Sequence, residues 1–183
     1  RAIALGLGAA GARVCLVGRR ADPLAETARH LAAQGYSTVP IPADVTREDD
    51  VARIGREAGR VDILVNNAGT SDRQPWGNVT GEDWDRVLDL NLRAAFRLAQ
   101  LFAPRMVEAG RGRIINIASI YGTLAPDRTL YPDAASFDLP SYGASKAGLL
   151  GLTRHLAALL GPQGVTVNAI SPGMMETERT ATL

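Results

Sequence analysis

The segment Val61-Asp-Ile-Leu-Val65 runs directly into Asn66-Asn67-Ala68-Gly69. A short, β-branched apolar run of this kind is typical of a buried strand in a parallel sheet. Similar runs recur at residues 13–17, near 39–46, at 114–117 and at 165–170. Helical patterns separate them, so the sequence predicts an α/β fold: a Rossmann-like, doubly wound parallel sheet with helices on both faces.

The helical patterns have recognisable starts and faces. One helix is expected to open with Asp22 as its cap and to end at Gly35, and the next is expected to follow a cap at Thr46. Residues 84–102 repeat apolar side chains at three- and four-residue steps, which predicts a long helix. Asn91 is the polar member of its apolar face.

The first residues contain Gly6-Leu-Gly8-Ala-Ala-Gly11, which matches the dinucleotide fingerprint G-x-G-x-x-G. That fingerprint requires a strand before it and a helix after it. Here a strand follows Gly11 almost at once, so we interpret residues 1–11 as the end of a helix. We expect the strand and phosphate loop that precede such a helix to lie outside these residues.

The composition is that of an ordinary globular protein, with 183 residues, 46% hydrophobic and 21% charged, which predicts one domain over residues 1–183. A net charge of +1 disfavours nucleic acid and acidic membranes as partners. Cys15 is the only cysteine, which excludes an internal disulfide and fits a reducing compartment. The sequence shows no membrane-length apolar run, leader pattern or metal-ligand spacing, so we expect a cytoplasmic protein without a metal.

Tyr142-Gly-Ala-Ser-Lys146 opens the last expected helix, which ends near Leu160. Residues four apart lie on one helix face, so the tyrosine and the lysine are expected to project side by side. A free tyrosine has a pKa of about 10. A lysine about 4 Å away, at an effective dielectric of about 20, would favour the phenolate by roughly 4 kcal/mol, or about three pKa units. The pair predicts an acid that works near neutral pH, although a solvated lysine on an ordinary helix is the alternative.

These segments together resemble the classical short-chain dehydrogenase/reductase family. The motifs that carry the resemblance stand in the family's order: Asp44-Val45, Asn66-Asn67-Ala68-Gly69, Asn91-Leu92, Ser119, Tyr142 with Lys146, Asn168, and Pro172-Gly173 with Thr177. The resemblance implies an NAD(P)(H)-dependent oxidoreductase that interconverts a secondary alcohol and a ketone by hydride transfer. Gluconate 5-dehydrogenases and 3-oxoacyl-carrier-protein reductases are both similar, and the sequence does not decide between them. A noncatalytic nucleotide-binding regulator and an inactive truncated fragment are the alternatives.

The resemblance also implies a role for each catalytic residue. Tyr142 would protonate the carbonyl oxygen, and Lys146 would favour the phenolate and hold the nicotinamide ribose. Ser119 would hydrogen-bond the substrate oxygen. Asn91 would hold a water behind Lys146 for a proton relay. Ser119 could instead cap the turn after its strand, and Asn91 could instead satisfy loosened helix carbonyls.

A cofactor site is implied by the same resemblance, at the carboxyl ends of the strands. Besides Tyr142 and Lys146, its expected members are Asp44 and Val45 near the adenine, Asn67, Ala68 and Gly69 along the adenosine, and Pro172, Gly173, Met175 and Thr177 around the nicotinamide. An acidic residue that binds the ribose 2′-hydroxyl is expected after the second strand, but Arg19 and Arg20 stand there. Arginine suits a 2′-phosphate, so we expect NADP rather than NAD, unless both arginines are simply solvated.

The chain departs from the family at both ends. The resemblance implies a first strand before residue 1, in the centre of the sheet, so we expect the sheet of this chain to be split. The chain stops soon after Thr177, so we expect a fragment of a longer enzyme that by itself binds the cofactor poorly. The interval between Ser119 and Tyr142 is longer than usual, which predicts a loop over the site from Thr123 to Pro140. Its substrate-contacting candidates are Asp127, Tyr131, Asp133 and Phe137, although a solvated excursion is equally consistent. The leucine-rich surface of the Tyr142 helix, with Gly148 and Gly151, favours an interface, unless the family's carboxyl-terminal segment covers it. The resemblance implies a homotetramer or homodimer of the full-length protein, acting on a small-molecule carbonyl or alcohol.

Overall fold

The structure is a computed structural model that describes residues 1–71, 74–127, 129 and 139–173. Helices alternate with strands, and every strand pairing is parallel, which confirms the predicted α/β class. The chain forms two compact units, Arg1–Arg60 and Val61–Leu183, which we describe separately. The described strands form two sheets, β1-β2 and β3-β4-β5, so the expected split of the sheet is confirmed.

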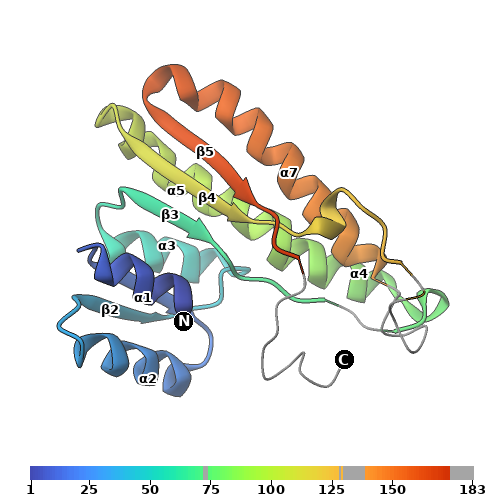
Figure 1. Cartoon of the computed structure of the whole chain (residues 1–183), viewed down its shortest axis with the longest axis horizontal. Coiled ribbons are helices and arrows are strands. Elements are labelled where there is room, and N and C mark those ends of the chain that lie inside the picture. The colour runs from blue at the N-terminus through green and yellow to red at the C-terminus, as the bar shows by residue number, and fades with distance from the viewer. Residues whose placement is uncertain (72–73, 128, 130–138, 174–183) are drawn as a thin grey trace. The chain divides into compact units, whose positions relative to one another are not determined.

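The first unit is a small layer of helices on a two-stranded sheet (Figure 1). Its elements are α1 (Ala2–Ala9), β1 (Val14–Gly18), α2 (Ala21–Ala32), β2 (Thr38–Pro42) and α3 (Glu48–Ala58). Leu31 of α2 and Ile41 of β2 are fully buried and anchor the packing. The apolar strand residues that the sequence marks therefore form the core of this unit.

The glycines of residues 1–11 serve packing and a turn. Gly6 and Gly8 lie inside α1, and a Cβ atom on Gly8 would come within 2.7 Å of the Tyr36 ring. Gly11 follows the helix with φ of +88°, a backbone conformation that favours glycine. The prediction that this segment is the end of a helix is confirmed.

Two predicted helix caps are wrong. The α2 helix begins at Ala21 with Arg20 as its cap, so Asp22 lies in the first turn, where a carboxylate also favours a helix. The α3 helix begins at Glu48 with Arg47 as its cap. Thr46 lies one residue before this cap, and its hydroxyl donates to Asp44 within the preceding turn.

The second unit is built on a three-stranded sheet in the order β3-β4-β5, seen side by side in Figure 1. Its elements are β3 (Ile63–Asn66), η1 (Trp76–Asn78), α4 (Gly81–Leu88), η2 (Asp89–Arg93), α5 (Ala94–Glu108), β4 (Gly112–Ile117), η3 (Ile120–Gly122), α7 (Pro140–Leu160), η5 (Gly161–Gln163) and β5 (Val165–Ile170). Helices α5 and α7 pack against this sheet, and α7 lies alongside β5.

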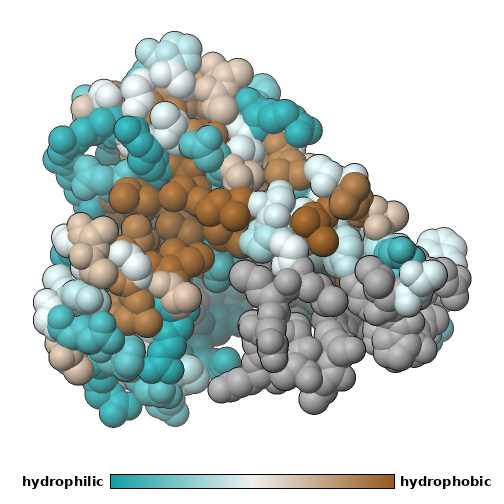
Figure 2. Space-filling model, viewed as in Figure 1, coloured by the Kyte–Doolittle hydropathy of each residue, from teal (hydrophilic) through white to brown (hydrophobic). Residues whose placement is uncertain are grey.

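Alternate strand residues separate the two faces of this sheet. Leu64, Ile114 and Val167 stand in register and are buried. Ile63 and Ile170 have the opposite alternation and are 42% and 54% exposed. Hydrophobic residues also gather on the side of the molecule that faces the viewer in Figure 2. The face of Leu64, Ile114 and Val167 is therefore covered, whereas the opposite face carries exposed apolar residues beside the exposed Arg113, Thr166 and Asn168.

The predicted long helix over residues 84–102 is real but not uniform. A capping box between Thr80 and Asp83 opens α4, and α4, η2 and α5 follow one another without a break. The η2 segment is a π-turn, in which the helix is locally wider by one residue. Asn91 sits inside this turn.

Candidate active site

The π-turn presents Asn91 to two neighbouring segments. Its side chain is 1% exposed, and its Oδ1 accepts from the Thr70 backbone N–H at 2.8 Å. Its Nδ2 donates to the Thr70 carbonyl at 2.9 Å and to Ser145 Oγ at 3.0 Å. The amide therefore links the chain after β3 to α7. The alternative was an asparagine that satisfies carbonyl groups of its own helix, but these three bonds go to other segments.

Ser145 relays this clamp to the tyrosine. The serine is fully buried, and its hydroxyl donates to the Tyr142 carbonyl at 2.7 Å while it accepts from Asn91. This role was not predicted from the sequence, although Ser145 lies inside the Tyr142 to Lys146 motif. The missed signal was a small polar residue three positions after the tyrosine, where a serine hydroxyl can reach a helix carbonyl.

Lys146 is buried against β4. Its side chain is 4% exposed, and Nζ donates to the Ile117 carbonyl at 2.6 Å. Nζ also lies 5.6 Å from the centre of the Tyr142 ring, so the predicted shared helix face is confirmed. Burial lowers the pKa of Lys146 to about 8, because removing an ammonium from water penalises its charged form.

Gly69 covers Asn91 and Lys146 from the end of β3. A Cβ atom at Gly69 would lie 3.3 Å from Asn91 Oδ1 and 3.7 Å from Lys146 Nζ. Such a Cβ atom would be tight against Asn91 Oδ1 and in ordinary van der Waals contact with Lys146 Nζ, so glycine gives the backbone its loosest fit here. The structure thus brings Gly69, Asn91, Tyr142 and Lys146 together in one cluster, which we call the lysine cluster.

Ser119 lies beside this cluster. It is 6% exposed, and its Oγ accepts from the Tyr121 N–H at 3.2 Å at the start of η3. Ser119 therefore caps the turn after its strand, which was the alternative to a catalytic role. Its hydroxyl uses only a lone pair in this bond, so its proton can still be donated to a substrate oxygen. A Cβ atom on Gly122 would lie 3.0 Å from the Lys146 carbonyl oxygen, so η3 packs tightly on α7.

The residues after β5 lie next to the segment that contains Ser119. The Pro172 carbonyl accepts from the Ile120 N–H at 3.2 Å, so Pro172 adjoins the segment that begins at Ser119. Gly173 is exposed. Met175 and Thr177 lie outside the described residues, as do Tyr131, Asp133 and Phe137 of the predicted loop, and Asp127 is exposed.

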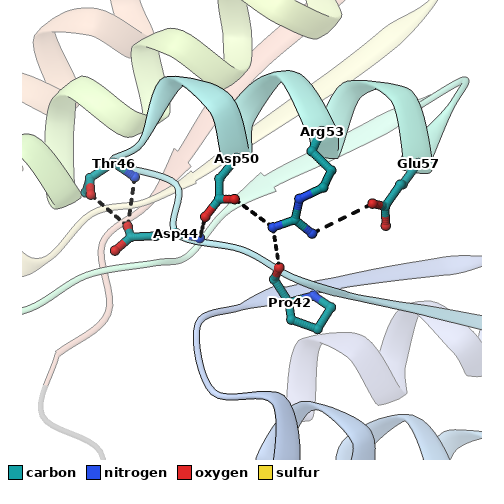
Figure 3. A network of polar contacts seen from close by, with 6 residues as sticks. All are labelled: Pro42, Asp44, Thr46, Asp50, Arg53 and Glu57. Carbon is teal, nitrogen blue, oxygen red and sulfur yellow. Dashed lines mark hydrogen bonds and ion pairs between the residues drawn. The ribbon is translucent and has the colours of Figure 1, made fainter.

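The expected adenine residues lie in the first unit, where Asp44 is tied into a polar network (Figure 3). Its Oδ1 accepts from the Thr46 N–H at 2.9 Å and from the Thr46 hydroxyl at 2.7 Å. Its own N–H donates to Asp50 Oδ2 at 2.7 Å, and Asp50 in turn accepts from Arg53 at 2.6 Å. Burial opposes ionisation of Asp44, but the bonds from Thr46 and the charge of Arg19 hold its pKa below the usual value.

Arg19 is not a free cation. Its Nη1 lies 3.7 Å from Asp44 Oδ2, and its side chain is 71% exposed. Arg20 is exposed and caps α2, whereas Val45 is buried in the core. In the second unit, Asn67 and Ala68 are exposed after β3. The structure therefore joins Arg19 to Asp44 within the first unit.

The described residues contain neither a candidate metal centre nor a candidate membrane span. No group of three or more histidine, cysteine, aspartate and glutamate side chains there could hold a metal ion. None of the helices in the same residues is both long and apolar enough to cross a membrane.

The chain is similar to known dehydrogenases. A family model described as short chain dehydrogenase matches residues 1–183. A Rhizobium meliloti (strain 1021) protein named probable galactose dehydrogenase GalD is 40% identical over 174 residues, covering 92% of this chain and 64% of that protein. Gluconate 5-dehydrogenase of Gluconobacter oxydans (strain 621H) is 35% identical over 185 residues, covering 99% of this chain and 68% of the relative.

The chain is also similar to a solved structure of a dehydrogenase. The gluconate 5-dehydrogenase of Burkholderia cenocepacia J2315, in complex with NADP and tartrate, is 31% identical with a TM-score of 0.84. The match covers 99% of this chain and 69% of that chain. This chain therefore spans about two thirds of the length of the proteins that it matches. Sequence and structure together establish that the chain belongs to the short-chain dehydrogenase/reductase family.

Proposed function

We propose that the protein containing this chain is an NAD(P)(H)-dependent oxidoreductase that interconverts a secondary alcohol and a ketone. The observation that carries the proposal is the lysine cluster, in which a buried ammonium lies 5.6 Å from the centre of the Tyr142 ring. A buried amine with a pKa of about 8 beside a phenol is costly for an ordinary helix and useful in proton transfer.

The proposed chemistry assigns one task to each side chain. Tyr142 donates its proton to the carbonyl oxygen during reduction and takes it back during oxidation. The Lys146 ammonium stabilises the phenolate left behind, and Ser119 donates its remaining hydroxyl proton to the substrate oxygen. Asn91 holds the chain after β3 and α7 together, so that Gly69 stays against Lys146. When bound, a nicotinamide cofactor supplies or accepts the hydride.

The described residues fit such a cofactor in two respects. Gly69 leaves a cradle over Asn91 and Lys146 that a Cβ atom would fill, and Lys146 would hold the ribose there. Arg19 presents an exposed guanidinium fork, which suits a 2′-phosphate by charge and shape. We therefore propose NADP as the preferred cofactor, with NAD as the alternative, and place Arg19, Arg20, Asp44 and Val45 at its adenosine end.

The substrate class we propose is a polyhydroxylated ketone, such as a keto sugar or keto sugar acid. Its support is the names of the two curated relatives and of the matched solved structure, which refer to galactose and gluconate. The 3-oxoacyl thioesters expected from the sequence are the competing class. Both classes present a ketone to the same tyrosine, so only a substrate comparison separates them.

A single experiment tests the function. The whole protein is assayed for oxidation of NADPH and NADH with keto sugars, keto sugar acids and 3-oxoacyl thioesters. Tyr142→Phe should abolish reduction while cofactor binding, followed by fluorescence, is retained. Tyr36→Phe is the matched control, because Tyr36 packs on Gly8 in the first unit. Cofactor binding without any reduction, or full activity in Tyr142→Phe, would favour a noncatalytic nucleotide-binding regulator.

We further propose that the full-length protein is a homodimer or homotetramer joined through the helices of the lysine cluster. Its support is an apolar groove of about 410 Å³ lined by Leu88, Asp89, Leu92, Arg93, Phe96, Gly148 and Leu152. Phe96 is 44% exposed at this groove. Sedimentation should show that Phe96→Glu dissociates the oligomer, whereas Gln100→Glu on the same helix does not. A cytoplasmic location stays a prediction that cell fractionation tests.

A further inference from the structure

A line of buried polar side chains crosses the second unit from β3 through β4 to α7. Asn66 Nδ2 donates to Asn116 Oδ1 at 2.8 Å, and Asn116 Nδ2 donates to Thr153 Oγ1 at 2.9 Å. The Thr153 hydroxyl then donates to the Leu149 carbonyl at 2.7 Å. Asn116 is 1% exposed and Thr153 is 7% exposed. Sequence analysis missed this line, although asparagine within an apolar strand is a visible signal.

The line ends next to the contact that holds Lys146. Ile117, which accepts the hydrogen bond from Lys146 Nζ at 2.6 Å, follows Asn116 directly in β4. Thr153 lies about two helical turns after Lys146 on α7. Strand β4 therefore holds α7 at two consecutive residues, once through the Asn116 side chain and once through the Ile117 carbonyl.

The two attachments differ in kind from the remaining contacts between the sheet and α7. Apolar residues such as Leu149, Val165 and Val167 are buried there, and apolar burial has no preferred direction. A small shift of α7 along β4 would keep such residues buried. Hydrogen bonds weaken steeply with distance and angle, so the same shift would break the bond between Asn116 and Thr153.

We propose that Asn116 and Thr153 are positioning residues that fix α7 along β4 and so hold the Lys146 ammonium at the Ile117 carbonyl. The inference rests on the proposed function for its catalytic consequence, because Lys146 acts there on Tyr142. Its structural part does not depend on the reaction. Asn66 supports Asn116 from the other side and completes the line.

The variant that tests this is Thr153→Val, which keeps the branched shape and removes the hydroxyl. Thr153→Ser restores the hydroxyl and serves as the conservative variant. The matched control is Thr27→Val in α2, because the Thr27 hydroxyl makes the same bond to the carbonyl four residues back, at 2.9 Å from Pro23 O. If Thr153→Val does not fold, Thr153→Cys is used, since a thiol is a weak partner of similar size.

The first readout is kinetic. In the whole protein, Thr153→Val should lower kcat about tenfold with KM within about twofold, because a small misplacement of a reacting group affects the transition state more than substrate binding. The alkaline limb of the pH profile should move by about half a unit or more. Thr153→Ser and Thr27→Val should keep the wild-type profile.

The second readout needs no activity. Lys146 is the only lysine among these 183 residues, so an amine-reactive reagent followed by peptide mass spectrometry reports on Nζ directly. Thr153→Val should raise the labelling rate of Lys146 several-fold, because Nζ leaves its carbonyl partner. Thr27→Val should not change this rate.

The outcomes separate this inference from the proposed function. An unchanged labelling rate and pH profile in folded Thr153→Val, or a Thr153→Ser that behaves like Thr153→Val, would overturn the positioning role. A wild-type protein that reduces no carbonyl, but whose Lys146 becomes more reactive in Thr153→Val, would overturn the function and support the positioning.

Discussion

The lysine cluster and the turn around Arg19 are both expected to hold parts of one cofactor, but they are built in opposite ways. Lys146 is 4% exposed and Asn91 is 1% exposed, and hydrogen bonds tie both to several segments of the second unit. Arg19 is 71% exposed and is joined to Asp44 by a single ion pair at 3.7 Å. The proposed chemical end is buried and hydrogen-bonded to its neighbours, whereas the proposed adenosine end presents an exposed charge with one ion pair.

The largest effect is expected when the charge of the lysine cluster is removed. Lys146→Met should lower kcat by roughly 10³-fold, because proton transfer loses its supporting charge. The same variant should be more stable than wild type by about 2 kcal/mol at pH 7. Lowering the lysine pKa from 10.5 to about 8 costs about 3 kcal/mol, and the lost bond to the Ile117 carbonyl offsets about 1 kcal/mol of the gain.

The stability difference should depend on pH in a defined direction. Because the unfolded chain binds the lysine proton more tightly, wild-type stability should rise between about pH 8 and 10.5. The advantage of Lys146→Met should therefore shrink across that window. Urea unfolding at pH 7, 8.5 and 10 measures this, and an advantage that does not change with pH would show that folding does not lower the pKa of Lys146.

A smaller effect is expected when the clamp is broken and the charge is kept. Asn91→Leu fills a similar volume but leaves the Thr70 N–H and carbonyl without their partner. We expect a loss of about 3 kcal/mol in the free energy of unfolding and roughly a 10²-fold loss of kcat, since Gly69 would no longer be held against Lys146. Denaturation and steady-state kinetics measure both. Asn78→Leu, at an exposed site, is the control, and equal losses in the two variants would refute a special role for the clamp.

At the adenosine end, the expected effect is smaller and selective. Arg19→Gln should raise KM for NADPH about tenfold, equivalent to about 1.4 kcal/mol, and leave KM for NADH within about twofold. Arg29→Gln, farther along α2, removes the same charge away from the turn. Equal changes for both cofactors would mean that Arg19 does not recognise a 2′-phosphate.

The smallest effect concerns Asp44, whose ion pair lies at the surface. Asp44→Asn should lower the free energy of unfolding by less than about 1 kcal/mol at pH 7. Because the folded pKa of Asp44 lies below 3.8, its contribution is present above pH 3.8 and is lost as the pH falls through the folded value. Thermal melts of the variant and wild type should therefore converge in acid. Asp49→Asn, in the first turn of α3, is the comparison.

The sequence predicted the strands and the shared face of Tyr142 and Lys146 because both follow from short periodic patterns. It also identified residues 1–11 as the end of a helix, because the fingerprint lacked its strand and helix. The caps predicted at Asp22 and Thr46 were wrong by one or two residues, because several neighbouring residues can occupy a helix start and the sequence pattern does not fix which one does.

Long-range contacts were beyond the sequence. The pairing of Arg19 with Asp44 depends on where two neighbouring strands end, and the line from Asn116 to Thr153 depends on how α7 lies on β4. No local pattern records either arrangement. The π-turn at Asp89–Arg93 was equally hidden, because its flanking residues keep the apolar spacing of an ordinary helix.

This π-turn also constrains how the helix can change its length. One residue corresponds to about 100° of rotation in an α-helix. A deletion within residues 89–93 that restored regular winding would therefore turn the apolar stripe of α5 away from β4, or the stripe of α4 away from α7. The wide turn sets the rotation of α5 relative to α4 about their common axis. Single-residue insertions and deletions should therefore be tolerated less here than in the exposed turn that follows α5.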